Sequence, residues 1–245
     1  MFIDRKTELD LLDQRYRSNQ AELFVLYGRR RVGKTELLRA FCADKPHVFF
    51  IATLSSDSEQ LATFSQQVYG FTHADVPSGF TFPSWEAALR ALGELPMQPK
   101  PIIVLDEFTY LISGNKAIPS ILQKVWDETL KNSQIMMVLC GSYIGMMETE
   151  VLGYQAPLYG RRTASTLLRP MDLASSALFF PGYSAEEKFI TWAVVGGMPY
   201  YLRTFQDSQD VYANIRQHIL DAQSGTLFNE PRLLLMEELR EPRNY

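Results

Sequence analysis

The chain has 245 residues, 46% of them apolar, so it can bury a sizeable core. Its 24 basic and 28 acidic residues give a net charge of -4, which offers no support for nucleic-acid binding by overall charge. The N-terminus lacks the apolar core of a signal peptide, and no apolar run reaches the length of a membrane span. We therefore expect a cytoplasmic protein without membrane contact.

Strand-like and helix-like segments alternate through the first two thirds of the chain. An amphipathic helical pattern opens it, and short apolar β-prone runs then alternate with helical stretches, which predicts a parallel sheet covered on both faces. A segment rich in glycine, proline and turn formers over residues 71–83 is expected to be irregular. The expected strands cover residues 23–27, 47–53, 102–105, 135–140 and 163–168, and the expected helices cover residues 7–17, 36–41, 58–69, 84–95 and 119–130.

The pattern changes after Pro170, where it becomes helical almost throughout. We expect a sheet domain over residues 1–170 and a helical lid or subdomain over residues 171–245. The expected helices of the second part cover residues 172–180, 185–195, 199–205, 211–221 and 226–239.

A glycine-rich segment between the first expected strand and the following helix fits the phosphate-loop pattern G-x-x-x-x-G-K-[ST]. The two glycines allow backbone amides to converge on an oxyanion at a helix N-terminus. Lys34 is expected to reach the β- and γ-phosphates, and the Thr35 hydroxyl to coordinate Mg²⁺. An accidental glycine-rich turn is the alternative. The residues expected to bind ATP or ADP here are Gly28, Arg29, Arg30, Arg31, Val32, Gly33, Lys34, Thr35 and Glu36.

An acidic pair follows the apolar run at residues 102–105. The end of a parallel strand is where a phosphate loop needs a carboxylate partner, so Asp106 is expected to be the second Mg²⁺ ligand. Glu107 is expected to polarise the attacking water. The alternative is a solvated acidic pair at a strand end.

Ser142 follows the expected strand at residues 135–140. If this strand lies between the phosphate-loop strand and the Asp106 strand, Ser142 is placed to sense the γ-phosphate. An N-cap role for a helix over residues 143–152 is equally compatible with the sequence.

These motifs together resemble the archaeal ATPase family, a branch of the STAND class of signal-transduction NTPases with AAA-like features. The resemblance extends over nearly the whole chain. Asp4-Arg5-Lys6 departs from the family's usual Gly-Arg-Glu. The matching segments are residues 2–9, 27–37, 104–108, 140–142, 158–163, 196–202 and 237–245.

The resemblance implies a P-loop NTPase fold with a five-stranded parallel sheet in the order 5-1-4-3-2, plus a C-terminal helical subdomain. It also implies that Pro199 approaches the nucleotide. Family members usually continue beyond a stretch such as residues 239–245 into a winged-helix domain, so the chain resembles a fragment that lacks its output domain. Gly196-Gly197 suggests a hinge before Pro199, since a structural turn would need only one glycine.

Two further arginines lie at the mouth of the last expected strand. Arg161 or Arg162 is a candidate to stabilise charge on the γ-phosphate, in this chain or in a neighbouring subunit. Pairing with an acid of the lid is the rival interpretation, and we favour it.

Two function classes remain open from the sequence. One is a Mg²⁺-dependent ATPase whose hydrolysis resets a conformational switch. The other is a nucleotide-binding scaffold with negligible turnover that organises a protein partner, another copy of itself, or nucleic acid through a missing C-terminal domain. Glu107 favours the first class.

Overall fold

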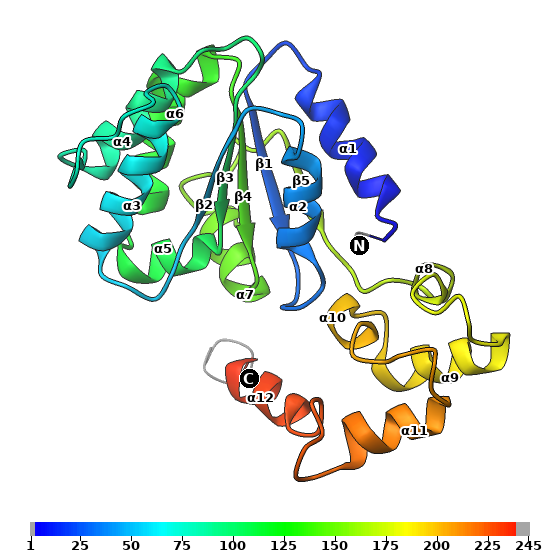
Figure 1. The fold of residues 1–245 in the computed structure, drawn as a ribbon. Coiled ribbons are helices and arrows are strands. Elements are labelled where there is room, and N and C mark those ends of the chain that lie inside the picture. Colours follow the sequence, from blue (N-terminus) through cyan, green and yellow to red (C-terminus); the bar gives the residue numbers. More distant parts are fainter. Residues whose placement is uncertain (1–2, 239–245) are drawn as a thin grey trace. The chain divides into compact units, whose positions relative to one another are not determined.

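A computed structural model describes residues 3–238 as an α/β fold with one parallel sheet followed along the chain by a helical segment (Figure 1). The strand order is β2-β3-β4-β1-β5, which is the predicted order read from the opposite edge. All neighbouring strands are parallel. The strands are β1 (Glu22–Tyr27), β2 (His47–Ile51), β3 (Ile102–Asp106), β4 (Met136–Gly141) and β5 (Ala164–Leu167).

The central strands are covered on both faces. Every residue of β3 and β4 is buried, as are the first five residues of β1. A strand that is buried on both sides needs apolar residues at successive positions, which explains the continuous apolar runs that identified these strands. Helices α3, α4 and α6 cover one face, and α1 and α2 cover the other (Figure 1).

All five helices predicted for this part of the chain are present, and two more occur. The segment Phe108–Gly114 forms a helix that the sequence pattern did not reveal, because seven residues are too few for a clear periodicity. The helices here are α1 (Lys6–Tyr16), α2 (Lys34–Cys42), α3 (Asp57–Gly70), α4 (Trp85–Ala91), α5 (Phe108–Gly114), α6 (Ile118–Glu128) and α7 (Ile144–Met146).

Helix starts follow the capping residues in the sequence. Ser56 accepts from the backbone of Glu59, whose carboxylate accepts in return from Ser56, so a complete capping box opens α3. Ser84 caps α4, and Trp85 and Leu89 are buried on its inner side.

The helical segment has a hydrophobic core of its own. Phe180, Leu202, Phe205 and Val211 are buried in it, together with Tyr183. The last helix starts at Glu230, later than expected, and the predicted end at residue 239 and the motif at residues 239–245 lie outside the described residues. The helices are α8 (Leu173–Ala177), α9 (Ala185–Val195), α10 (Pro199–Leu202), α11 (Val211–Ile215) and α12 (Glu230–Glu238).

The chain divides into two compact units. One comprises residues 5–28 and 34–167 and contains the sheet, and the other groups residues 3–4 and 29–33 with residues 168–238. Over residues 3–238, none of the helices is both long and apolar enough to cross a membrane.

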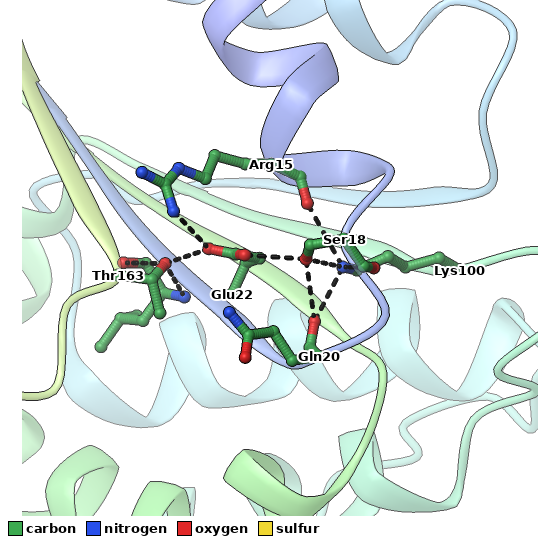
Figure 2. A network of polar contacts seen from close by, with 7 residues as sticks. Arg15, Ser18, Gln20, Glu22, Lys100 and Thr163 are labelled. Carbon is green, nitrogen blue, oxygen red and sulfur yellow. Dashed lines mark hydrogen bonds and ion pairs between the residues drawn. The ribbon is translucent and has the colours of Figure 1, made fainter.

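A polar network surrounds a buried carboxylate at the amino end of β1 (Figure 2). The Glu22 side chain is fully buried and accepts hydrogen bonds from Ser18 Oγ, at 2.7 Å, and from Thr163 Oγ1. Arg15 places a guanidinium nitrogen 4.0 Å from the carboxylate. Glu22 therefore joins the end of α1, the start of β1 and the residue before β5.

Lys100 extends the same network from the loop before β3. Its ammonium donates to the carbonyl oxygens of Gln20, at 2.9 Å, and Ser18, at 3.1 Å (Figure 2). Burial lowers the pKa of Lys100, and the nearby charge of Glu22 acts in the opposite direction. These contacts fix the connection that enters β1.

We expect Glu22→Ala to lower the free energy of unfolding by about 1.5–3 kcal/mol, because the half-buried hydroxyls of Ser18 and Thr163 each lose a charged hydrogen-bond acceptor. Chemical denaturation would measure this. Glu186→Ala, on the exposed first turn of α9, is the control and should cost no more than about 0.5 kcal/mol. Equal stability of the two variants would contradict this structural role.

Candidate functional site

The carboxyl ends of three neighbouring strands bring the sequence motifs together. Tyr27 at the end of β1 pairs with Gly141 at the end of β4, and β4 pairs in parallel with β3, which ends at Asp106. The phosphate loop follows β1 directly, Glu107 follows β3 and Ser142 follows β4. The edge at the carboxyl ends of parallel strands is where such sheets bind ligands.

The lysine of the phosphate loop begins helix α2 and is buried. Lys34 is 6% exposed, and its ammonium donates to the carbonyl oxygen of Gly28 at 2.8 Å. This bond spans the loop from its last residues to its first. A cation at a helix N-terminus is opposed by the helix dipole, so the position suits a lysine that meets a bound anion.

The loop hydroxyl and the β3 carboxylate are in direct contact. Thr35 Oγ1 donates to Asp106 Oδ2 at 2.6 Å, and Asp106 Oδ1 accepts from the backbone amide of Glu107 at 2.9 Å. Asp106 is 1% exposed. Two hard oxygen donors are thus side by side at the loop, as a Mg²⁺ site requires.

One hydroxyl and one carboxylate are enough protein ligands for Mg²⁺. The ion keeps several of its water molecules, which complete its octahedral coordination. Across residues 3–238, no three His, Cys, Asp or Glu side chains are grouped so that they could hold a metal ion. The Thr35–Asp106 pair offers the hydroxyl and carboxylate oxygens that Mg²⁺ prefers.

Glu107 and Ser142 form a second hydroxyl–carboxylate pair. Ser142 Oγ donates to Glu107 Oε2 at 2.6 Å, and Ser142 is 7% exposed. Glu107 has left-handed backbone angles, φ 51° and ψ 43°, which are uncommon for a residue other than glycine. Ser142 does not cap the following helix, whose N-cap position is Tyr143.

The backbone of the phosphate loop turns through positive φ angles at three residues. Gly33 has φ 93° and Gly28 has φ 153°, conformations that a side chain disfavours, while Arg31 adopts φ 67° despite its side chain. Successive turns of this kind direct N–H groups into an anion-binding concavity.

The other residues predicted around the loop differ in exposure. Val32 is fully buried, Arg29 and Glu36 are exposed, and Arg30 is half-buried. Arg31 forms an ion pair with Glu230. Nothing in the sequence spacing pointed to Glu230, because a contact between residues so distant along the chain leaves no local pattern.

Arg161 and Arg162 make structural contacts. The Arg161 guanidinium bonds both oxygens of Asp127 on α6, at 2.6–3.1 Å, and also donates to the carbonyl oxygen of Pro157. Arg162 donates to the carbonyl oxygen of Leu152. The acid that pairs with Arg161 thus belongs to the sheet unit and not to the helical segment. A role for either arginine at a phosphate stays a prediction.

Each of the paired glycines before Pro199 has a local structural reason. Gly196 ends α9 with φ 65°, and a Cβ added to Gly197 would lie 1.7 Å from the carbonyl oxygen of Met171. The amide of Met171 donates to the carbonyl oxygen of Gly197 at 2.7 Å. The argument that only a hinge would need both glycines is therefore wrong. Pro199 itself begins α10.

This sheet order, with a glycine-rich loop between β1 and α2 and a carboxylate at the end of β3, defines the P-loop NTPase class. A family model described as an ATPase domain predominantly from Archaea matches residues 2–205. The chain belongs to this family.

Two relatives from Methanocaldococcus jannaschii share sequence with the chain. An uncharacterized protein is 33% identical over 202 residues, which are 82% of this chain and 43% of that relative. An uncharacterized ATP-binding protein is 51% identical over 45 residues, 18% of this chain and 76% of the relative. The chain thus spans less than half of the first relative's length.

Solved structures share the fold at low sequence identity. The Walker-type ATPase PABY2304 of Pyrococcus abyssi aligns with a TM-score of 0.65 at 21% identity, covering 99% of this chain and 76% of that one. The ORC2 protein of Aeropyrum pernix, solved in ADPNP and ADP complexes, aligns with a TM-score of 0.57 at 14% identity, covering 97% and 68%.

Proposed function

We propose that the chain binds ATP and ADP with Mg²⁺ through residues 28–35 and hydrolyses ATP. The observation that carries this proposal is the hydrogen bond between Thr35 and Asp106, which joins the loop hydroxyl to the β3 carboxylate beside Glu107. A solvated acidic pair would not place a fully buried Asp106 against the phosphate loop.

Phosphate binding would use both the backbone and the lysine. The first amides of α2 and the loop amides donate to phosphate oxygens, and Lys34 exchanges its bond to the Gly28 carbonyl for a charge-assisted bond to phosphate. When bound, Mg²⁺ would be held by Thr35 and Asp106 and would neutralise phosphate charge.

Glu107 is the group proposed to accept a proton from the attacking water. In the structure, its carboxylate accepts a hydrogen bond from the Ser142 hydroxyl. A γ-phosphate would compete for that hydroxyl, and donation by Ser142 to phosphate would leave Glu107 free to orient water.

The comparisons support this proposal at the level of the family. One relative is named as ATP-binding and one structural neighbour as a Walker-type ATPase. We further propose a cytoplasmic location. The relative that is 33% identical extends well beyond the region that it shares with this chain.

We also propose that nucleotide binding alters the segment from Gly196 to Tyr201. A Cβ added to Gly33 of the phosphate loop would lie 3.6 Å from Pro199 Cγ, so the loop residues 29–33 and the start of α10 are neighbours within one unit. Hydrolysis would then reset this segment from one state to the other.

Lys34→Ala is expected to weaken ATP binding at least tenfold, because a charge-assisted contact of about 1.5–3 kcal/mol is lost. Calorimetry measures this. Lys124→Ala, which removes an exposed lysine on α6, is the matched control and should bind as the wild type does. Equal affinities of all three proteins would remove the basis of the proposal.

Glu107→Gln should bind ATP but hydrolyse it about 10²–10⁴-fold more slowly, because the amide cannot accept the proton from water. Single-turnover assays with and without Mg²⁺ measure this, with the exposed Glu94→Gln as control. Equally negligible turnover of the wild type would favour the scaffold function.

Saturating ADP should slow hydrogen exchange of backbone amides in residues 196–201, and Pro199→Ala should reduce this protection more than it reduces overall stability. Mass spectrometry of the exchanged peptides gives the comparison, with α4 as the internal reference. Unchanged exchange in this segment would make it an ordinary interhelical turn.

A further inference from the structure

Arg31 occupies an unusual backbone conformation at the centre of the phosphate loop. Its φ of 67° lies in the left-handed region, which glycine enters freely and a residue with a Cβ enters only at a cost. The loop thus contains three positive φ angles but only two glycines. Some other interaction has to hold Arg31 in place.

The side chain of Arg31 is held on two sides by the helical segment. Its guanidinium forms an ion pair with Glu230 and lies 4.5 Å from the ring centre of Tyr200. The Tyr201 hydroxyl donates to Glu230 at 2.9 Å. All four residues belong to the same compact unit of the chain. We refer to Glu230, Tyr200 and Tyr201 as the Arg31 clamp.

The burial of Glu230 distinguishes this contact from an ion pair on the surface. The Glu230 side chain is 7% exposed and the Arg31 side chain is 32% exposed. A carboxylate that is this deeply buried needs a cation and hydrogen-bond donors. An arginine over an aromatic ring adds a cation–π attraction.

The pKa shifts of Arg31 and Tyr201 are consistent with these contacts. Burial lowers the pKa of Arg31, but the hydrogen bond and the charge of Glu230 outweigh it and raise the pKa overall. Burial, followed by the hydrogen bond to Glu230, raises the pKa of Tyr201 to about 12. Tyr201 therefore remains a neutral donor to Glu230 over the physiological range of pH.

We propose that Arg31 is a positioning residue for the nucleotide's phosphates: the clamp holds its side chain, and thereby keeps its backbone left-handed so that the loop amides face an oxyanion. This inference rests on the proposed nucleotide binding and deepens it. Arg31 acts through its backbone and its neighbours' amides, while its guanidinium stays with Glu230. The first turn of α12, which begins at Glu230, becomes part of the phosphate site's support.

The coupling between the clamp and phosphate binding is reciprocal, so it also predicts an effect of nucleotide on α12. If the clamp favours the loop conformation that binds phosphate, then bound phosphate favours the clamp by the same factor. Nucleotide should therefore increase the protection of the first turn of α12.

Calorimetry of ADP binding to variants of Arg31 and of Glu230 tests this proposal. Glu230→Gln leaves the loop sequence intact and should weaken ADP binding about three- to tenfold. Arg31→Met should have a similar effect, and the double variant should be little worse than either single one, because both remove one interaction. Arg31→Lys, which keeps the charge but not the planar fork, should fall between wild type and Arg31→Met. Glu186→Gln, an exposed position on α9, is the control.

A second pair of variants tests the backbone argument itself. Arg31→Ala and Arg31→Gly both lack the clamped side chain, but only glycine enters the left-handed region without cost. Arg31→Gly should therefore bind ADP several-fold more tightly than Arg31→Ala. Equal affinities of these two variants would overturn the proposed role of the backbone.

Two other outcomes would overturn the inference. If Arg31 bound phosphate directly, Arg31→Met would weaken ADP binding whereas Glu230→Gln would leave it unchanged or tighten it by releasing the guanidinium. If the contact only stabilised the fold, both variants would lower the melting temperature while the folded protein bound ADP normally. Failure of the wild type to bind ADP would instead refute the proposed function, and the inference with it.

Discussion

The candidate site depends on the parallel alignment of β1, β3 and β4. Because these strands run in the same direction and in register, the residues that follow them meet at one edge of the sheet. The contact of 2.6 Å between Thr35 and Asp106 is the direct result, since the two residues come from segments far apart in the sequence. If one of these strands ran antiparallel, its motif would lie at the opposite edge of the sheet, and in a different strand order the motifs would no longer be neighbours.

The polar groups at the two ends of β1 differ in the kind of partner that they have. At the amino end, the Glu22 carboxylate has protein partners in Ser18, Thr163 and Arg15 (Figure 2). At the carboxyl end, the hydroxyls pair with carboxylates in contacts that a nucleotide and its metal could replace. The first arrangement suits stability, whereas the second suits a site whose polar partners change when a ligand binds.

Particular residues show where sequence reasoning succeeded and where it stopped. Apolar runs located the strands, because buried parallel strands require them. The strand order came from the family resemblance, since an apolar run does not indicate which strands are its neighbours in the sheet. Ser142 had two interpretations, and the structure shows a third contact, donation to Glu107. Helix α5 was missed because its seven residues are too short for a periodic signal. Gly196 and Gly197 looked like a hinge, yet each meets a local backbone requirement.

The sequence by itself determined the phosphate loop, the acid at the end of β3, the capping serines and the helical character of the last third, because each is encoded over a few consecutive residues. Only the tertiary structure decided which partner each polar side chain has. Arg161 binds Asp127, Arg31 binds Glu230, and Glu22 binds Thr163, all across long stretches of chain. Such pairs depend on packing between distant elements, and neither composition nor periodicity records them.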